Sequence, residues 1–417
     1  VWDLYSNRVV PWWCTGIPND GNWMDQLRPI SHAWMDEKDH VNEWTPINRY
    51  EWPVPIPKDT NLNLICIEML NLDGGYVWLD VLCLRQEGGL GEESEDMRME
   101  EWELDVPTIG AVYHTSWNVV CYLSGLGQPL SLKEGDLDSD RSWFRRAWTL
   151  EEIGDKRVIA GDTPDGPLHA EDKDGEYETE LLARFHKQLQ SMKGISYGDV
   201  CAVLKSMQKR VSTNPVDKVA GLAFLMGSEM IPAYHESQSL EEAWVALMNS
   251  VDVMCQGQLF FLCPEPGNAG TKWRPSWDQV MMKSLPEYDF APNIQLYCDE
   301  TGNEDWCSDV VCIEKGSVRG LAVVEGSDRH GELIVKDEGG IEHRFEIMAT
   351  HTYSIPEDTY TLISASTELT FPRYGWVVGR SLPGGKFEKV SVLEIPDEEY
   401  YRLGGLCITD WGQYILI

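Results

Sequence analysis

The sequence predicts an α/β domain with a parallel sheet, followed by a helical region and a β-rich C-terminal module. Apolar runs alternate with helical patterns over residues 25–160, and helical stripes dominate the next part of the chain. After about residue 260, short β-branched and aromatic runs alternate with turn residues. The predicted boundaries are 1–161 for the α/β domain with an N-terminal extension, 162–180 for an acidic linker, 181–255 for the helical region and 256–417 for the β-rich module.

The α/β domain is predicted to begin with a strand and an amphipathic helix. Pro29–Trp34 has the pattern of a short strand. After a connection rich in Trp and Pro, Asp59 can cap a helix that Gly74 and Gly75 end. The spacing i, i+3, i+4, i+7 gives this helix a buried face made of Leu62, Ile65, Cys66 and Met69.

A second strand is predicted over Tyr76–Leu84, which is almost continuously apolar apart from Asp80. A strand covered on both faces has this composition, so we expect a central parallel strand. A helical stripe over Met99–Tyr113, interrupted at Pro107, then leads to a third strand in Trp117–Leu123. This alternation is typical of βαβ units with right-handed crossovers.

The last elements of the α/β domain are a helix and a strand. Ser142–Ile153 is predicted to be helical, with Trp148 and Glu152 four residues apart on one face. Lys156–Gly161 is predicted to be a strand. The polar stretch 162–180 is typical of a linker, since its Gly stands at the wrong offset for a calcium loop.

The C-terminal half combines core helices with a β-rich module. Leu181–Met192 and Val200–Met207 carry apolar stripes, and Ser239 with Glu242 forms a capping box at the start of a third helix. The short strands that follow predict a small barrel or sandwich.

Charge and composition exclude several function classes. The net charge of −35 repels nucleic-acid phosphates and anionic lipids, so we expect neither a nucleic-acid nor a membrane partner. No run approaches the roughly 18 apolar residues of a membrane span, and the N-terminus lacks the regions of a signal peptide. The absence of an initiator Met leads us to expect a few residues before Val1. The 11 cysteines include no C-x-x-C pair, which favours reduced thiols and a cytoplasmic location.

Neither a metal site nor an independent nucleophile is predicted. Cys307 and Cys312 have no His or second Cys pair nearby, which disfavours zinc. Cys83 could form a thiolate pair with His32 or His114, but its apolar surroundings favour a buried, inert thiol. The dinucleotide, Walker A, nucleophile-elbow and zinc-protease motifs are all absent from the sequence.

Three segments resemble the fungal heterokaryon-incompatibility (HET) domain, in the order that this family has. They are Ile30–Trp34 (ISHAW), Tyr76–Gln86 (YVWLDVLCLRQ) and Trp143–Glu152 (WFRRAWTLEE). Pro215–Leu222 and Trp273–Trp277 look like segments that often follow the domain. The resemblance implies a cytoplasmic protein of incompatibility or innate-immunity type, acting in programmed cell death. It also implies a flavodoxin/TIR-like parallel-sheet fold.

The same resemblance implies a chemistry. Some TIR domains cleave NAD⁺ with a Glu four residues after a Trp, and Trp148 and Glu152 match this spacing. Loss of nicotinamide leaves positive charge on the ribose, which a carboxylate can stabilise or capture. Glu152 is therefore the candidate catalytic residue, NAD⁺ the candidate substrate, and no resident cofactor is required.

Candidate binding residues come from the same segments, because ligands of open α/β sheets lie beyond the carboxyl ends of the strands. The arginines could meet a pyrophosphate or form salt bridges, and the tryptophans could anchor the core. Asp80 could instead satisfy buried backbone donors. The candidate binding set is Ser31, His32, Trp34, Asp80, Arg85, Gln86, Arg145, Arg146 and Trp148.

Three departures from the family pattern keep the function open. Met35 stands where the family usually has Gly, Arg85 replaces Asn or Asp, and Glu151 replaces Gln. Besides an NAD⁺-cleaving effector, the sequence is compatible with a non-enzymatic scaffold that self-associates or binds a protein partner. A repurposed metabolic enzyme is the third class.

Overall fold

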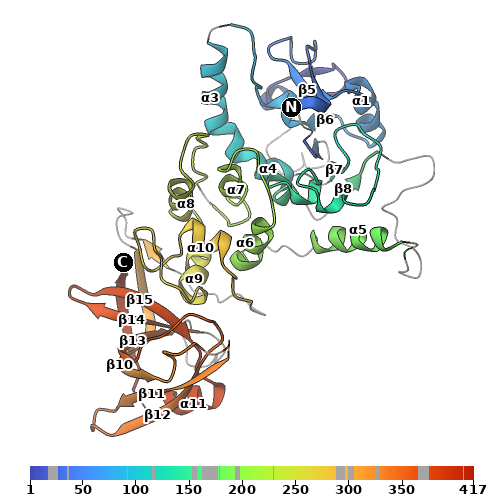
Figure 1. Ribbon diagram of the computed structural model, residues 1–417. Coiled ribbons are helices and arrows are strands. Elements are labelled where there is room, and N and C mark those ends of the chain that lie inside the picture. The colour runs from blue at the N-terminus through green and yellow to red at the C-terminus, as the bar shows by residue number, and fades with distance from the viewer. Residues whose placement is uncertain are drawn as a thin grey trace. The chain divides into compact units, whose positions relative to one another are not determined.

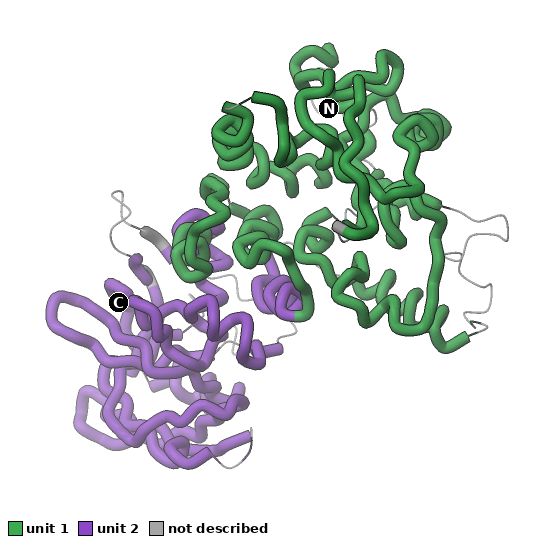
Figure 2. The backbone as a smooth tube through the Cα atoms, turned by 45° about the horizontal axis from the view of Figure 1, so that its top comes forward, with its two compact units in different colours: residues 1–196, 209–247 green, residues 197–208, 248–417 purple. Residues whose placement is uncertain are grey.

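The computed structural model forms two compact units (Figures 1 and 2). Unit 1 contains residues 1–196 and 209–247, and unit 2 contains residues 197–208 and 248–417. The helical region of the sequence therefore contributes to both units. The structure describes residues 1–16, 27–34, 37–91, 93–114, 116, 118–152, 157–161, 177, 179–192, 198–228, 230–287, 296–298, 305–324, 326, 328–364, 375–406 and 408–417.

Unit 1 is a mixed α/β fold around a six-stranded sheet of order β2-β1-β6-β3-β7-β8. The strands β6, β3, β7 and β8 are mutually parallel, whereas β1 pairs antiparallel with β6. The predicted α/β class is thus confirmed. The bounds are β1 Trp2–Asp3, β2 Arg8–Val9, β3 Leu27–His32, β6 Tyr76–Trp78, β7 Val119–Tyr122 and β8 Arg157–Ile159, with a separate ribbon of β4 His40–Glu43 and β5 Val54–Pro57.

The order of the strands reverses beside β3. The chain runs from β3 to β6 on one side and then crosses to β7 on the other side of β3. Ser31 pairs with Cys121 and His32 with Tyr122, so both side chains lie at the carboxyl end of β3 next to β7. A reversal of this kind is where open α/β sheets bind ligands.

Helix α1 (Leu62–Asn71) confirms the predicted buried face. Its buried residues are Leu62, Ile65, Cys66 and Met69, which join the apolar cluster of β3, β6 and β7. The N-cap is Asn61, whose side chain accepts a hydrogen bond from the Asn63 amide at 2.9 Å. The prediction that Asp59 caps this helix was therefore wrong.

The strand predicted over Tyr76–Leu84 is shorter than expected. It ends at Trp78, and Asp80–Cys83 forms the single helical turn α2. The Asp80 carboxylate accepts the Val81 amide at 2.8 Å, which favours a turn over continued strand pairing. Strand β6 does lie inside the sheet and parallel to β3, but it is antiparallel to β1.

The helix predicted over Ser142–Ile153 is replaced by two 3₁₀ turns, η6 (Trp143–Arg145) and η7 (Trp148–Leu150). Between them Arg146 has extended backbone and forms an isolated parallel bridge with Val211. The Ala147 amide donates to the Val211 carbonyl at 2.9 Å. This pairing with a distant segment diverts the backbone from the helical path.

The helical patterns predicted around Pro107, over Leu181–Met192 and after Ser239 correspond to helices of unit 1. Pro107 lies between two helices, as expected, and the Ser239–Glu242 capping box is present, with the Glu242 amide donating to Ser239 Oγ at 3.3 Å. Nearly all of the predicted linker 162–180 lies outside the described residues. The bounds are η1 Trp12–Cys14, η3 Glu37–Asp39, α3 Ser94–Asp105, η4 Val106–Thr108, α4 Ile109–His114, η5 Asp136–Asp138, α5 Glu180–Ser191, α7 Asp217–Ala220 and α8 Leu240–Met248.

Unit 2 confirms the predicted β-rich module and adds helices to it. The pairing of β10 with β16 closes a ring through β13, β14 and β15, while β11 and β12 extend from β10. Phe260 and Phe261 of α9 join the apolar cluster of the barrel strands. The bounds are α6 Val200–Gln208, α9 Val253–Leu262, α10 Trp277–Met282, β9 Tyr297–Cys298, β10 Asp305–Arg319, β11 Arg329–Lys336, β12 Glu342–Ala349, β13 Asp358–Ser364, β14 Trp376–Leu382, β15 Lys386–Leu393, α11 Asp397–Gly404 and β16 Asp410–Leu416.

Among the described residues, no single helix is long and apolar enough to cross a membrane. Helices α8 and α9 taken together, with a break between them, have the length and composition that such a span needs.

Candidate functional site

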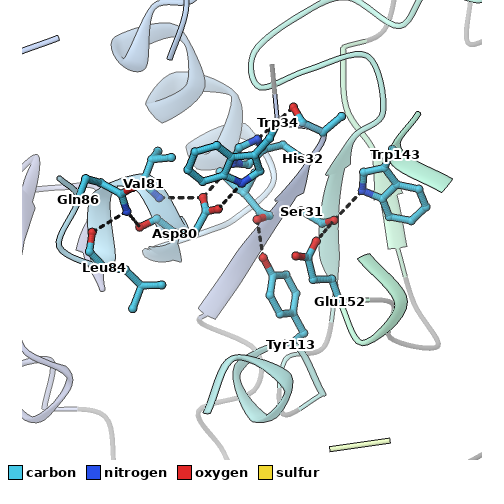
Figure 3. A network of polar contacts seen from close by, with 12 residues as sticks. Ser31, His32, Trp34, Asp80, Val81, Leu84, Gln86, Tyr113, Trp143 and Glu152 are labelled. Carbon is cyan, nitrogen blue, oxygen red and sulfur yellow. Dashed lines mark hydrogen bonds and ion pairs between the residues drawn. The ribbon is translucent and has the colours of Figure 1, made fainter. Parts of the chain in front are cut away.

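Glu152 meets the end of β3 through Ser31 (Figure 3). The Ser31 hydroxyl donates to Glu152 Oε2 at 2.5 Å, and the indole N–H of Trp143 donates to Ser31 Oγ at 2.7 Å. Ser31 is fully buried and Trp143 nearly so. The three side chains come from two of the segments that resemble the HET domain, and the fold joins them through hydrogen bonds.

His32 and Asp80 form a second group on the other side of β3. His32 Nε2 lies 2.8 Å from Asp80 Oδ1, and the Trp34 indole donates to Asp80 Oδ2 at 3.0 Å. The rings of His32 and Trp34 stack with centroids 5.9 Å apart. Burial alone would lower the pKa of His32, but the Asp80 carboxylate outweighs it and raises that pKa above its usual value. Correspondingly, His32 holds the pKa of Asp80 below its usual value in spite of burial.

The two groups do not combine into a Ser-His-Asp triad. Neighbouring residues of a strand point to opposite faces, so Ser31 and His32 diverge. The ring nitrogens of His32 face Asp80 and the Ala33 carbonyl, the latter at 3.4 Å, and neither faces the Ser31 hydroxyl. His32 therefore cannot act as a general base for Ser31 in this arrangement.

The carboxyl group of Glu152 is tuned to ionise near neutral pH. Burial is the main cause that raises its pKa, to about 7, and the Asp80 charge adds to the rise. The Ser31 hydrogen bond and the charges of His32 and Arg210 oppose it. A carboxyl group with such a pKa can be an anion or exchange a proton at physiological pH.

Glu151 lies apart from this group. It is 2% exposed, and a Cβ added to Gly110 of α4 would lie 2.8 Å from Glu151 Oε2. Burial, with Glu152 as the second cause, raises the pKa of Glu151 well above its usual value. Adjacent in sequence, the two glutamates occupy different surroundings.

Arg210 belongs to the site, although no motif or spacing in the sequence selects it. Its guanidinium is buried and donates to the Arg146 carbonyl at 2.6 Å and to Thr149 Oγ1 at 2.7 Å. Both acceptors belong to the segment that precedes Glu152. The long-range pairing of Arg146 with Val211 brings Arg210 here.

Arg85 and Gln86 have structural partners. Arg85 pairs with Glu101 at 3.0 Å and with Glu51 at 3.3 Å, and its guanidinium lies over the Trp52 ring. Gln86 donates to the Leu84 carbonyl at 3.0 Å and to the Asp80 carbonyl at 3.4 Å, which braces the turn that presents Asp80.

Arg145, Arg146 and Trp148 also make contacts away from the Glu152 carboxylate. Arg145 pairs with Asp140 at 3.1 Å, and Arg146 donates to Thr213 Oγ1 at 3.2 Å. The Trp148 indole hydrogen-bonds Asp217, which also accepts the Tyr234 hydroxyl at 2.7 Å. Asp217 lies in Pro215–Leu222, so this segment anchors Trp148.

Neither of two hollows formed by described residues is lined by Glu152. One holds only about 10 Å³ and lies beside His32, Trp34 and His40 in unit 1. The other, here called the unit 2 groove, holds about 1330 Å³ and is lined by α6, α9, α10 and the barrel. The cleft expected between Glu152 and the loop Ser31–Met35 stays a prediction, because Met35 lies outside the described residues. Trp143, Thr149 and Arg210 lie beside the turn that ends at Glu152.

Thiols and metal ligands contribute no further centre within the described part of the chain. No three His, Cys, Asp or Glu side chains gather there as metal ligands do. Cys307 and Cys312 form no disulfide bond. Cys83 contacts the Val77 carbonyl at 3.9 Å, and burial raises the pKa of Cys121, next to Ser31, to about 12.

No protein-family model matches the sequence, and no curated protein or solved structure matches it at a significant level.

Proposed function

We propose that unit 1 is a HET-like domain that hydrolyses the nicotinamide–ribose bond of NAD⁺, with Glu152 as the catalytic residue. The observation that carries the proposal is the Ser31–Glu152 hydrogen bond, which fixes a partly buried carboxylate at the carboxyl end of β3. This point is also where the order of the strands reverses.

The sheet supports a flavodoxin-like reading of unit 1. Taken in chain order, β3, β6, β7 and β8 are the first to fourth parallel strands, and their spatial order is second, first, third, fourth. Flavodoxin-like sheets begin with this order and bind ligands between their first and third strands. Here those strands are β3 and β7, and Ser31 pairs with Cys121 between them.

The chemistry follows from the charges. Departure of nicotinamide leaves an oxocarbenium-like ribose, which the Glu152 carboxylate stabilises. Water then attacks the anomeric carbon, and Glu152, whose pKa is about 7, accepts the proton that water loses. The products are nicotinamide, ADP-ribose and one proton.

The test is to incubate the purified chain with NAD⁺, both dilute and concentrated, and to measure nicotinamide and ADP-ribose. Hydrolysis predicts equal amounts of both products. The rate should rise with pH through about 7, as Glu152 becomes an anion. Absence of both products at every concentration would reject the proposal.

A scaffold function is the second candidate, because the hollow beside His32 and Trp34 holds only about 10 Å³. That volume is about enough for one water molecule. NAD⁺ binding would have to displace side chains such as Trp34, which is 37% exposed. A scaffold predicts self-association or partner binding without nicotinamide release, which light scattering beside the NAD⁺ assay would detect.

A further inference from the structure

Arg210 is a buried cation that lacks an ion-pair partner among the described side chains. It is 3% exposed, and its guanidinium donates to the Arg146 carbonyl and to the Thr149 hydroxyl. Its other terminal nitrogen contacts Met192 Sδ at 3.4 Å. Burial lowers the pKa of Arg210 to about 9, which still leaves the guanidinium charged at neutral pH. A buried charge of this kind is costly and needs a compensating interaction.

The backbone fixes Arg210 beside the Glu152 turn independently of its side chain. The Val211 amide donates to the Arg145 carbonyl at 2.6 Å, and the Ala147 amide donates to the Val211 carbonyl at 2.9 Å. Arg210 therefore reaches its acceptors from a backbone already paired with the same loop.

Thr149 connects Arg210 to the carboxylate group through hydrogen bonds. Its hydroxyl accepts from Arg210 and lies 2.6 Å from the Trp143 carbonyl, to which it donates. The Trp143 indole then donates to Ser31 Oγ, which holds Glu152. Each step involves a residue that is buried or partly buried, so displacement of Arg210 would be transmitted to Glu152.

We propose that Arg210 is a positioning residue of this site, which clamps the segment before Glu152 through Arg146 and Thr149 and brings a buried positive charge to it.

The balance of charges around Glu152 supports this role. The charges of His32 and Arg210 lower the pKa of Glu152, and the charge of Asp80 raises it. His32 has Asp80 as its ion-pair partner, whereas Arg210 is held by the Arg146 carbonyl and the Thr149 hydroxyl. Burial raises the pKa values of Tyr113, Cys121 and Glu151. Arg210 therefore contributes a positive charge that favours the Glu152 anion. Its effect on catalysis rests on the proposed function, whereas its effect on the ionisation of Glu152 does not.

The experiment is an NMR titration of ¹³C-labelled glutamate carboxyl groups in the full chain, with Glu152→Gln identifying the Glu152 signal. In Arg210→Gln, which removes the charge and keeps an amide donor, the midpoint of Glu152 should rise by about one pH unit or more. Arg210→Lys keeps the charge and should shift it by less than about half a unit. Arg184→Gln removes an exposed arginine paired with Asp138 and should leave the midpoint unchanged.

An unchanged Glu152 midpoint in Arg210→Gln would overturn the proposal. If Arg210→Gln does not fold, Arg210→Lys decides alone, since a shift of a full unit there would show that the retained charge does not set the midpoint. In the NAD⁺ assay, the pH optimum for nicotinamide release by Arg210→Gln should move to higher pH, as the midpoint of the Glu152 titration does. If wild type releases no nicotinamide while the midpoint still shifts, the proposed function fails and the role of Arg210 stands.

Discussion

Functional sites usually combine space for a ligand with polar groups whose pKa values are perturbed. The Glu152 site has such polar groups, whereas the unit 2 groove has the space. The site in unit 1 has buried charges, a carboxyl group with a pKa of about 7 and hydrogen bonds between distant segments, but its adjoining hollow holds about 10 Å³. The groove holds about 1330 Å³, yet its two lysines already pair with the groove residues Glu287 and Glu265.

The difference shows why volume alone does not locate chemistry. Ligand pockets are identified by space together with convergent polar groups whose pKa values are perturbed. His351 in the groove has a lowered pKa, mainly from burial, but its Nε2 donates to the Val392 carbonyl while Nδ1 accepts the Tyr353 amide. Both ring nitrogens of His351 are therefore used in hydrogen bonds to the backbone, whereas the Glu152 carboxyl group can change its charge near neutral pH.

The largest expected effect on stability is in the His32–Asp80 pair. Asp80→Asn leaves the His32 cation buried without its anion, which should lower the free energy of unfolding of unit 1 by about 3 kcal/mol at mildly acidic pH. The raised pKa of His32 makes its contribution greatest below 6.5, and that contribution is lost as pH rises through the raised value. The cost of Asp80→Asn should therefore shrink in alkaline buffer, as urea unfolding at several pH values would show.

Glu394→Gln is the matched control in the groove, where the carboxylate accepts the Thr350 hydroxyl at 2.9 Å on the surface. Its cost should stay below about 0.5 kcal/mol at every pH. A pH-independent loss for Asp80→Asn would contradict a charged His32–Asp80 pair.

A smaller effect of opposite sign is expected for Glu152→Gln. Because the pKa of Glu152 rises from 4.5 to about 7 on folding, the folded chain binds the extra proton between these values and loses stability as pH increases through them. Removing the charge should stabilise unit 1 by about 2 kcal/mol above pH 7 and give no advantage below about pH 4.5. Equal stability of both proteins at pH 8 would contradict the burial of this charge.

The smallest effect is expected for Lys205→Ala in the groove. Lys205 pairs with Glu287 at 3.0 Å, and the Glu287 side chain is 90% exposed. Exposed pairs contribute little, so the free energy of unfolding should change by less than about 0.5 kcal/mol. Thermal unfolding at low and high salt measures this change in stability. A loss above about 1 kcal/mol would show that charged pairs in the groove stabilise the protein as much as those in unit 1.

The sequence predicted the parts of the site that depend on local pattern. The apolar run around Ile30 placed Ser31 and His32 on a strand, and the segment resemblance selected Glu152. The helix expected around Trp148 failed because Arg146 pairs with Val211, a contact between segments far apart in the chain. Arg210 was missed for the same reason, since neither periodicity nor spacing reports which distant backbone pairs with a loop.

Whether Glu152 is the catalytic residue is decided by measuring nicotinamide release by Glu152→Gln and, as the matched control, by Glu151→Gln. Both substitutions keep the volume, but only Glu152 hydrogen-bonds Ser31 and ionises near neutral pH. If Glu152 is catalytic, Glu152→Gln should lower kcat by about 100-fold or more with less change in KM, because the lost charge acts mainly in the transition state. Glu151→Gln should stay within about threefold of wild type. Equal release of nicotinamide by wild type and Glu152→Gln would show that Glu152 is not the catalytic residue.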